Sequence, residues 1–324
     1  MGILEVQAIC SLSKHLKTDL SPDSRTMSRG ALYFIRMSTK MFFPSFPFTE
    51  RQDVYPEIDP EVQYASKTHK GKVVFITGAS RGIGEELAVT YAKAGASLIL
   101  AARTQKAMDE VKAKILRQVP SAHVLTVPTD VVDLWQVEAA VKAGIERFGK
   151  LDIVIANAGK ADDVTQSISE KDPLEWWKIV EVNVRGVYNV AHFALPYLSK
   201  ANGYFLVTSS MAGTARYQYG SPYSISKEAV NAFVEYVALE FPMVKTFALH
   251  PGVVDTEMTR GTRFPPTENV RLAPAAYLYL TAGKADWLSG RYISVTWDMG
   301  ELQSVWKDKI LESDAFVSRI TVPV

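Results

Sequence analysis

Between residue 71 and about residue 300, short apolar runs alternate with longer stretches of helical periodicity. Runs that are apolar throughout are typical of parallel strands buried on both faces. These runs cover residues 72–77, 97–102, 123–127, 151–156, 204–208, 244–249 and 291–295. The helical stretches cover residues 83–94, 104–118, 133–148, 173–198, 221–241 and 271–282. The alternation predicts an α/β fold with one doubly wound parallel sheet of about seven strands and helices on both faces.

No linker interrupts the alternation, so residues 71–300 are predicted to form one domain. Residues 1–70 carry five prolines and show no sustained period of about 3.6 or 2 residues. We interpret them as an N-terminal extension that is partly irregular. Residues 301–324 form a C-terminal tail in this division. The function is therefore expected to lie in the central domain.

Composition removes several classes of function. The 36 basic and 35 acidic residues give a net charge of +1, which provides no basic footprint for nucleic acid. The single cysteine, Cys10, excludes an intrachain disulfide and a multi-cysteine metal site, and it fits a reducing, cytoplasmic compartment. No stretch reaches the roughly 18 uninterrupted apolar residues of a membrane span. A small molecule is therefore the expected partner, and no metal is expected.

A glycine-rich turn joins the first predicted strand to the first helix, and residues 77–84 read TGASRGIG. Glycines let the backbone bend tightly and let a diphosphate approach, and the helix start offers unpaired N–H groups. The spacing Gly-x3-Gly-x-Gly differs from the Gly-x-Gly-x2-Gly of the commonest dinucleotide-binding turns. The turn predicts nucleotide binding. The residues expected to line the phosphates are Gly78, Ser80, Arg81, Gly82, Ile83 and Gly84.

The end of the second strand indicates which nucleotide is preferred. Ala102 stands where NAD enzymes place an acid for the ribose 2′-hydroxyl, and Arg103 follows it. Together with Arg81 in the turn, Arg103 supplies guanidinium groups that suit a 2′-phosphate. We therefore predict NADP(H), with NAD(H) as the alternative. The other interpretation is that Arg103 is an ordinary solvated residue after a strand.

Tyr223 and Lys227 lie four residues apart, on one face of the helix predicted over 221–241. A free tyrosine titrates at about 10. A neighbouring ammonium group favours the phenolate, which would permit proton exchange near neutral pH. Such pairs also arise by chance on solvated helices, so this spacing alone does not establish a site.

Further polar residues and glycines fall where the predicted strands end. The carboxyl ends of parallel strands share one edge of the sheet, and ligands bind at that edge. We interpret His250, just before the Pro-Gly turn, as structural or adjacent to the cofactor rather than as a catalytic base. These residues are Asn157, Gly159, Ser210, His250, Pro251 and Gly252.

Over about residues 70–300 the sequence resembles the short-chain dehydrogenase/reductase superfamily. The resemblance rests on these motifs in this order: the TGASRGIG turn, NAG at 157–159, Asn183 within the next helix, Ser210, YxxxK at 223–227 and the Pro-Gly turn at 251–252. Residues 289–302 (SGRYISVTWDMGEL) resemble fungal-type members. The resemblance implies a Rossmann-type fold and an oxidoreductase that transfers a hydride between a nicotinamide cofactor and a carbonyl or secondary alcohol. It further implies a ketoreductase for a small molecule, such as a secondary metabolite.

The resemblance also implies residue roles. Tyr223 would be the general acid/base, and Ser210 would hydrogen-bond the substrate oxygen. Lys227 would hold the ribose hydroxyls and lower the tyrosine pKa, and Asn183 would support a water that links Lys227 to solvent. Ser209 is adjacent to Ser210, but the spacing of 13 residues from Ser210 to Tyr223 fits better. Besides Arg103, Tyr223 and Lys227, the implied cofactor contacts are Asp130, Val131, Asn157, Gly159, Pro251, Gly252, Val254 and Thr256.

Several alternatives stay open. One is a cofactor-binding regulatory protein with little turnover, and another is a redox-neutral epimerase or dehydratase on the same fold. Residues 256–274 are expected to cover the pocket, with Gly261 as a hinge and apolar residues near the substrate: Met258, Phe264, Pro265 and Pro266. A homodimer or homotetramer is expected, and four aromatic residues form either a dimer face or part of the core: Trp176, Trp177, Tyr188 and Phe193.

Overall fold

The computed structural model describes residues 46–260 and 264–320. Cys10, most of the N-terminal extension and Gly261 lie outside the described residues, as do residues 321–324. Among the helices that are described, none combines the length and the apolar character needed to cross a membrane.

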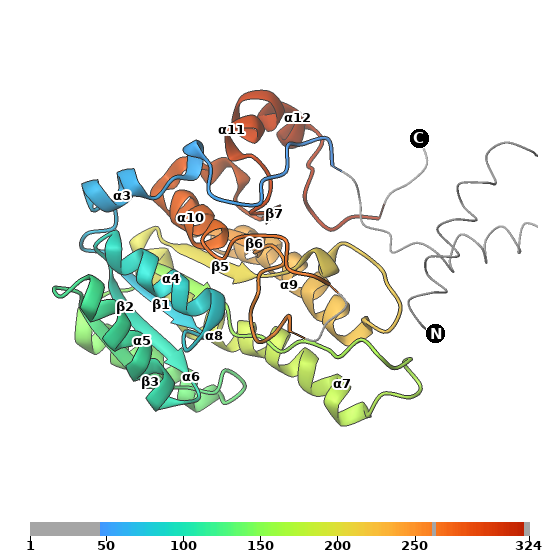
Figure 1. Ribbon diagram of the computed structural model, residues 1–324, viewed down its shortest axis with the longest axis horizontal. Coiled ribbons are helices and arrows are strands. Elements are labelled where there is room, and N and C mark those ends of the chain that lie inside the picture. The colour runs from blue at the N-terminus through green and yellow to red at the C-terminus, as the bar shows by residue number, and fades with distance from the viewer. Residues whose placement is uncertain (1–45, 261–263, 321–324) are drawn as a thin grey trace, which may run out of the picture. The chain divides into compact units, whose positions relative to one another are not determined.

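Seven strands form one sheet in the order β3-β2-β1-β4-β5-β6-β7, and every neighbouring pair is parallel (Figure 1). The strands are β1 (Val73–Thr77), β2 (Ser97–Ala102), β3 (Val124–Pro128), β4 (Ile153–Ala156), β5 (Tyr204–Thr208), β6 (Lys245–His250) and β7 (Arg291–Ser294). Each lies within two residues of its predicted position. The strand order changes direction between β1 and β4, and doubly wound sheets open a ligand crevice at such a point.

Helices cover both faces of the sheet, so the predicted fold class is confirmed (Figure 1). One apolar core packs α4 (Gly82–Lys93), α5 (Gln105–Gln118) and α10 (Leu272–Tyr279) on the first face. The other packs α6 (Leu134–Phe148), α8 (Gly186–Ala201) and α9 (Ser221–Glu240) on the second face. Side chains of successive strand residues alternate between these two cores, which is why the central strands are almost entirely apolar.

The helical stretch predicted over residues 173–198 is divided into three segments. They are α7 (Pro173–Val180), a π-helical turn (Glu181–Arg185) and α8. A second π-helical turn (Leu280–Lys284) follows α10. A π turn widens the helix locally and is frequent at functional sites. The hydrophobic period gave no sign of it, because apolar residues continue on both sides.

Residues 46–58, from the predicted extension, pack beside β7. The Arg51 guanidinium binds Asp298 through Nε at 2.9 Å and Nη2 at 2.7 Å. Tyr55 and Ile58 are buried in the core that contains α4 and α10. The short helices of this flank are a 3-10 turn (Pro56–Ile58) and α3 (Glu61–Ser66).

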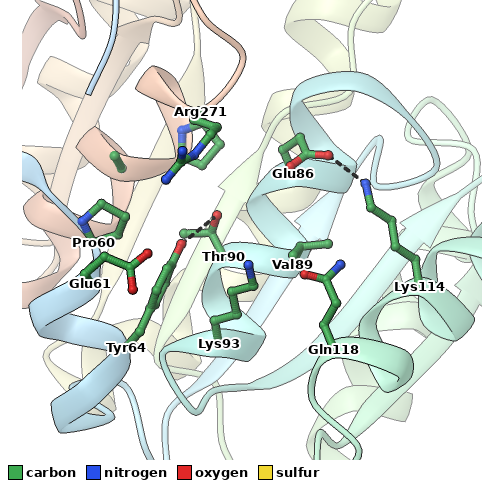
Figure 2. A pocket seen from close by; sticks show the side chains of 12 residues that line it. Pro60, Glu61, Tyr64, Glu86, Val89, Thr90, Lys93, Lys114, Gln118 and Arg271 are labelled. Carbon is green, nitrogen blue, oxygen red and sulfur yellow. Dashed lines mark hydrogen bonds and ion pairs between the residues drawn. The ribbon is translucent and has the colours of Figure 1, made fainter.

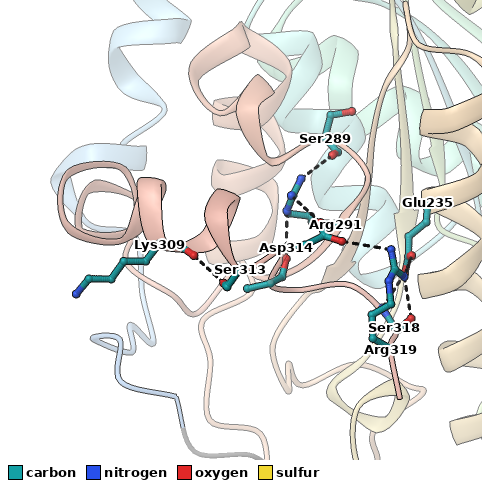
Figure 3. Close-up of polar contacts among 9 residues, drawn as sticks. Glu235, Ser289, Arg291, Lys309, Ser313, Asp314, Ser318 and Arg319 are labelled. Atoms are coloured by element: carbon teal, nitrogen blue, oxygen red, sulfur yellow. Dashed lines mark hydrogen bonds and ion pairs between the residues drawn. The ribbon is translucent and has the colours of Figure 1, made fainter. Parts of the chain in front are cut away.

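The short helix α11 (Met299–Glu301) crosses the predicted boundary at residue 300, and the predicted C-terminal tail continues with a π turn (Leu302–Trp306) and α12 (Lys307–Glu312). Beyond α12 the chain returns to the sheet (Figure 3). Arg291 at the start of β7 pairs with Asp314 at 3.1 Å, and Arg319 pairs with Glu235 of α9 at 2.5 Å. The boundaries at residues 70 and 300 stay predictions; within the described residues, the segments on both sides pack against the central domain.

Candidate active site

The glycine turn between β1 and α4 has no room for a side chain at Gly84. A Cβ there would lie 2.2 Å from the carbonyl oxygen of Gly78 and 2.7 Å from Nδ2 of Asn157. Gly78 and Gly82 have φ values of +65° and +58°, a region that favours glycine. No described side chain caps α4, so the first N–H groups of this helix remain available to a ligand.

Asn157 follows β4 and ties this turn to the middle of the sheet. Its Nδ2 donates to the carbonyl oxygens of Thr77 at 3.1 Å and Gly78 at 3.3 Å. Its Oδ1 accepts from the hydroxyl of Thr208, at the end of β5, at 3.2 Å. Asn157 and the glycine turn therefore form one hydrogen-bonded unit at the crevice between β1 and β4.

Ser210, Tyr223 and Lys227 come together beside this unit. Ser210 caps a 3-10 turn (Met211–Gly213), and its hydroxyl lies close enough to that of Tyr223 to lower the Tyr223 pKa. Lys227 Nζ lies 5.5 Å from the centre of the Tyr223 ring. The same ammonium group donates to the carbonyl oxygen of Thr208 at 2.7 Å. A hydroxyl pair with a buried ammonium group behind it is an arrangement that can polarise a carbonyl oxygen and deliver a proton.

The pKa of Tyr223 differs from the sequence-based expectation. Burial of the hydroxyl raises its pKa to about 12, although part of the side chain is accessible, and the neighbouring Ser210 hydroxyl acts in the opposite direction. Burial also lowers the pKa of Lys227 from its usual 10.5 to about 8. The sequence-based expectation weighed the nearby Lys227 charge and omitted desolvation, which has the largest effect on the Tyr223 pKa and raises it.

The two adjacent serines make different contacts with α9. Ser209 is buried, and its hydroxyl contacts Asn231 of α9 at 2.5 Å and the backbone carbonyl of Lys227 at 3.3 Å. Ser210 instead lies against Tyr223. The geometry thus separates a serine that anchors α9 from a serine that faces the reacting centre.

Asn183 lies in the π turn between α7 and α8 and is almost fully buried. Its Nδ2 donates to the Lys160 carbonyl at 3.0 Å and to Ser226 Oγ at 2.9 Å, and its Oδ1 accepts from the Lys160 N–H at 2.8 Å. A Cβ on Gly159 would lie 3.3 Å from Asn183 Oδ1 and 3.8 Å from Lys227 Nζ. Asn183 therefore fixes the loop after β4 beside the lysine. Its expected contact with a water stays a prediction.

The two arginines of the predicted phosphate end are both exposed. Arg81, in the glycine turn, forms an ion pair with Glu257, with 3.0 Å between Nε and the carboxylate. Arg103 directly follows β2 and makes no ion pair with any described residue. Glu257 was not among the predicted residues, and its position in an irregular segment gave no signal. Asp130 and Val131 lie at the end of β3, at the same sheet edge, but away from the catalytic side chains; the Val131 carbonyl accepts from Asn189 of α8 at 2.9 Å.

The segment after β6 completes the edge. Gly252 has a φ of +82°, and the N–H after it, that of Val253, donates to the Glu268 carboxylate. Val254 forms a backbone bridge with Glu268. Glu268, like Glu257, was not among the residues predicted from the sequence. Thr256 approaches the glycine turn, because a Cβ on Gly82 would lie 3.3 Å from Thr256 Cγ2.

Parts of the predicted cover reach the site. Met258 Cε would lie 3.8 Å from a Cβ on Gly159, and the Phe264 ring meets that of Tyr217 edge-on at 5.6 Å. Pro265 and Pro266 are exposed. His250 is buried, and burial lowers its pKa to about 4, so it is neutral at neutral pH.

The residues present fit a dinucleotide. The turn offers open backbone and uncapped helix N–H groups, and Ala102 and Arg103 present a cation and no carboxylate at the end of β2. Within the residues described, no group of three or more His, Cys, Asp or Glu side chains could hold a metal ion.

A cleft of about 150 Å³ lies elsewhere, between α3, α4, α5 and α10 (Figure 2). It mixes basic and acidic side chains, and Lys114 is bound to Glu86 at 2.7 Å. None of its lining residues belongs to the predicted site.

Comparisons with known proteins agree with this geometry. Residues 72–265 match the family model of short chain dehydrogenases. The chain is 37% identical over 280 residues to the short chain dehydrogenase pigC of Monascus ruber, a match that covers 82% of this chain and 90% of that protein. Other similar curated proteins also come from fungi, including Aspergillus terreus.

Two solved structures show the same fold. An alcohol dehydrogenase from the archaeon Thermococcus sibiricus, complexed with 5-hydroxy-NADP, has a TM-score of 0.62 and 30% identity, over 69% of this chain and 95% of that one. A 3-ketoacyl-(acyl-carrier-protein) reductase from Brucella melitensis, complexed with NADH, has a TM-score of 0.64 and 28% identity, over 70% and 97% of the two chains.

Proposed function

The chain belongs to the short-chain dehydrogenase family, and from this premise we propose that it is an NADP(H)-preferring ketoreductase that acts on a small carbonyl compound, such as a secondary metabolite. The observation that carries the proposal is the placement of the Ser210 and Tyr223 hydroxyls side by side, with Lys227 behind them, beside an open glycine turn. A cytoplasmic location remains part of the proposal, because the chain has one cysteine.

The side chains divide the work as follows. When bound, a nicotinamide cofactor supplies the hydride in reduction. Ser210 and Tyr223 hydrogen-bond the substrate carbonyl oxygen, and Tyr223 donates its proton to that oxygen as negative charge develops there. Lys227 holds positive charge behind the phenol and would bind ribose hydroxyls. Asn183, Asn157 and the glycine turn keep the loop after β4 in place.

The direct test is consumption of NADPH by the purified protein with a panel of ketones. Loss of NADPH absorbance with formation of the alcohol supports a ketoreductase. Turnover of a substrate without net NADPH consumption would instead identify a redox-neutral reaction on the same fold.

Cofactor preference can be tested at Arg103. Replacing it by alanine removes a charge-assisted contact to the 2′-phosphate, which is worth about tenfold to a hundredfold in affinity. We expect the Kd of NADPH, measured by fluorescence titration, to rise by that factor while the Kd of NADH stays within about twofold. The matched control is Arg117→Ala, an exposed arginine in the last turn of α5. Equal effects on both nucleotides, or none, would refute the assignment.

We include a homodimer or homotetramer in the proposal. Trp177 and Tyr188 are 64% and 52% exposed, and Tyr236 on α9 is 62% exposed, which leaves a large aromatic surface on α7, α8 and α9. Trp176 and Phe193 are partly buried instead, and Trp176 Nε1 donates to Ser221 Oγ at 3.1 Å.

Sedimentation velocity tests this assembly. At micromolar concentration we expect a dimer or tetramer, and Tyr188→Asp should shift it to monomers, because a charge at the centre of an apolar interface is unpaired. Trp135→Asp on α6, where Trp135 is 72% exposed, is the control and should leave the assembly unchanged. A monomeric wild-type protein would contradict the proposal.

A further inference from the structure

Thr208, the last residue of β5, joins the catalytic lysine to the cofactor side of the site. Its carbonyl oxygen accepts from Lys227 Nζ at 2.7 Å. Its hydroxyl donates to Asn157 Oδ1 at 3.2 Å and lies 2.9 Å from the hydroxyl of Tyr277. Tyr277 is on α10, which covers the opposite face of the sheet from α9. The contact therefore links the two faces through the end of a single strand.

The direction of the Tyr277–Thr208 hydrogen bond follows from counting protons. Asn157 Nδ2 faces two carbonyl oxygens, so its amide orientation is fixed and Oδ1 must be the atom that faces Thr208. An amide oxygen only accepts, so the single hydroxyl proton of Thr208 goes to Asn157. The Tyr277 hydroxyl must then donate to Thr208 Oγ1.

Tyr277 is well suited to be a permanent donor. Its side chain is completely buried, and burial raises its pKa above the usual value, so the hydroxyl stays protonated. The Tyr91 hydroxyl donates to the Tyr277 backbone carbonyl at 3.2 Å, which holds this turn of α10 against α4. The donor is thus fixed in protonation state, and its ring is held by the surrounding core residues.

We propose that Tyr277 is a positioning residue of the cofactor site, acting through Thr208 and Asn157 on the glycine turn. This inference rests on the proposed function. Tyr277 donates to Thr208, Thr208 donates to Asn157, and Asn157 in turn holds the Thr77 and Gly78 carbonyls. Without the Tyr277 hydroxyl, Thr208 Oγ1 loses the donor that holds it opposite Asn157 Oδ1, and Asn157 is held less firmly on that side.

The test is Tyr277→Phe, which removes only the hydroxyl. We expect the Kd of NADPH, measured by titration of the protein without substrate, to rise about threefold to tenfold, the size of one net hydrogen bond. The KM for the cofactor should rise by a similar factor while kcat changes little, because cofactor binding rather than the transition state is affected.

Tyr91→Phe is the matched control. Its hydroxyl is buried in the same core and contacts Thr281 at 2.8 Å and the Tyr277 carbonyl, but not Thr208. We expect it to lower the Tm and leave the Kd of NADPH unchanged. Thr208→Val keeps the shape and the carbonyl of Thr208 and should reproduce the weaker binding of Tyr277→Phe, and the double variant should bind no more weakly than Thr208→Val alone.

The outcomes separate the inference from the proposed function. If the wild-type protein binds NADPH and Tyr277→Phe binds it equally well, Tyr277 is only a core residue and the inference is overturned. Equal weakening by Tyr91→Phe would overturn it as well, because the effect would then be general loss of packing. If the wild-type protein binds neither NADPH nor NADH, the proposed function itself fails, and the inference with it.

Discussion

Tyr223→Phe should lower kcat by about a hundredfold to ten-thousandfold and leave the Kd of the cofactor nearly unchanged. The substitution removes the hydroxyl that lies beside Ser210 and keeps the ring that packs near Lys227. The rate falls because the substrate oxygen no longer receives a proton from a positioned acid. Steady-state kinetics with NADPH and a competent ketone, combined with a titration of cofactor binding, measure both quantities.

Tyr236→Phe is the control for this experiment, since Tyr236 lies on the same helix but is 62% exposed. It should retain the wild-type kcat. Near wild-type turnover by Tyr223→Phe would remove Tyr223 from the mechanism, and Ser210→Ala would then have to be examined alone. The removal of Ser210 and Tyr223 together should cost less than the sum of the single effects, because the two hydroxyls act on one oxygen.

The raised pKa of Tyr223 also predicts how the rates depend on pH. Reduction uses the protonated phenol, which predominates well below the pKa of about 12, so kcat/KM for ketone reduction should be insensitive to this group near neutral pH. Alcohol oxidation uses the phenolate. As the pH is raised toward the pKa, the phenolate population increases about tenfold for each pH unit, and the oxidation rate should increase with it. The two pH profiles therefore test the burial of Tyr223 directly.

The fold could be predicted in detail because its signal is local. Most strands are rich in apolar and β-branched residues, and each of the seven lies within two residues of the predicted range. The kinds of residue at the site were also predictable, since YxxxK and the glycine turn are short motifs. Asn183 could be identified from the sequence. The π turn that contains it could not, because the period of apolar residues does not reveal where a helix widens.

What the sequence could not show are contacts between distant residues. Thr208 and Tyr277 are 69 positions apart, and Arg81 and Glu257 come from segments that only the folded sheet edge brings together. Burial also depends on distant parts of the chain. Whether a nearby charge lowers the Tyr223 pKa or desolvation raises it depends on how several elements pack around the hydroxyl. Sequence spacing therefore predicts which residues are neighbours on one helix. It does not predict how deeply those residues are buried or what packs around them.

Lys227→Met should abolish most of the activity and make the protein more stable near neutral pH. Burial lowers the Lys227 pKa from 10.5 to about 8, and this shift corresponds to about 3 kcal/mol of unfavourable free energy for the charged form in the folded state. Methionine has a similar shape without the charge. The substitution also removes the hydrogen bond from Lys227 to the Thr208 carbonyl, which costs about 1–2 kcal/mol. The free energy of unfolding should therefore increase by about 1–2 kcal/mol in total.

The pH dependence of this gain has a definite sign. Below about pH 8 the lysine is charged in both the folded and the unfolded chain, and the full penalty is present. Between about 8 and 10.5 the unfolded chain binds more protons than the folded one, so the stability of the wild-type protein rises with pH through this window. The advantage of the methionine variant should therefore disappear by about pH 10.5.

Thermal unfolding at about pH 7 and about pH 10, alongside kcat, measures this prediction. The Lys227→Met variant should unfold a few degrees above the wild-type protein at the lower pH and lose that lead at the higher one, while kcat falls about a hundredfold or more. Lys245→Met, at the start of β6 and outside the site, serves as the control for charge removal. A methionine variant that is less stable at the lower pH would mean that the buried ammonium contributes more through its hydrogen bond than it costs by desolvation. The expected pattern would instead show that the fold gives up stability to keep a cation behind Tyr223, as binding and catalytic sites commonly do.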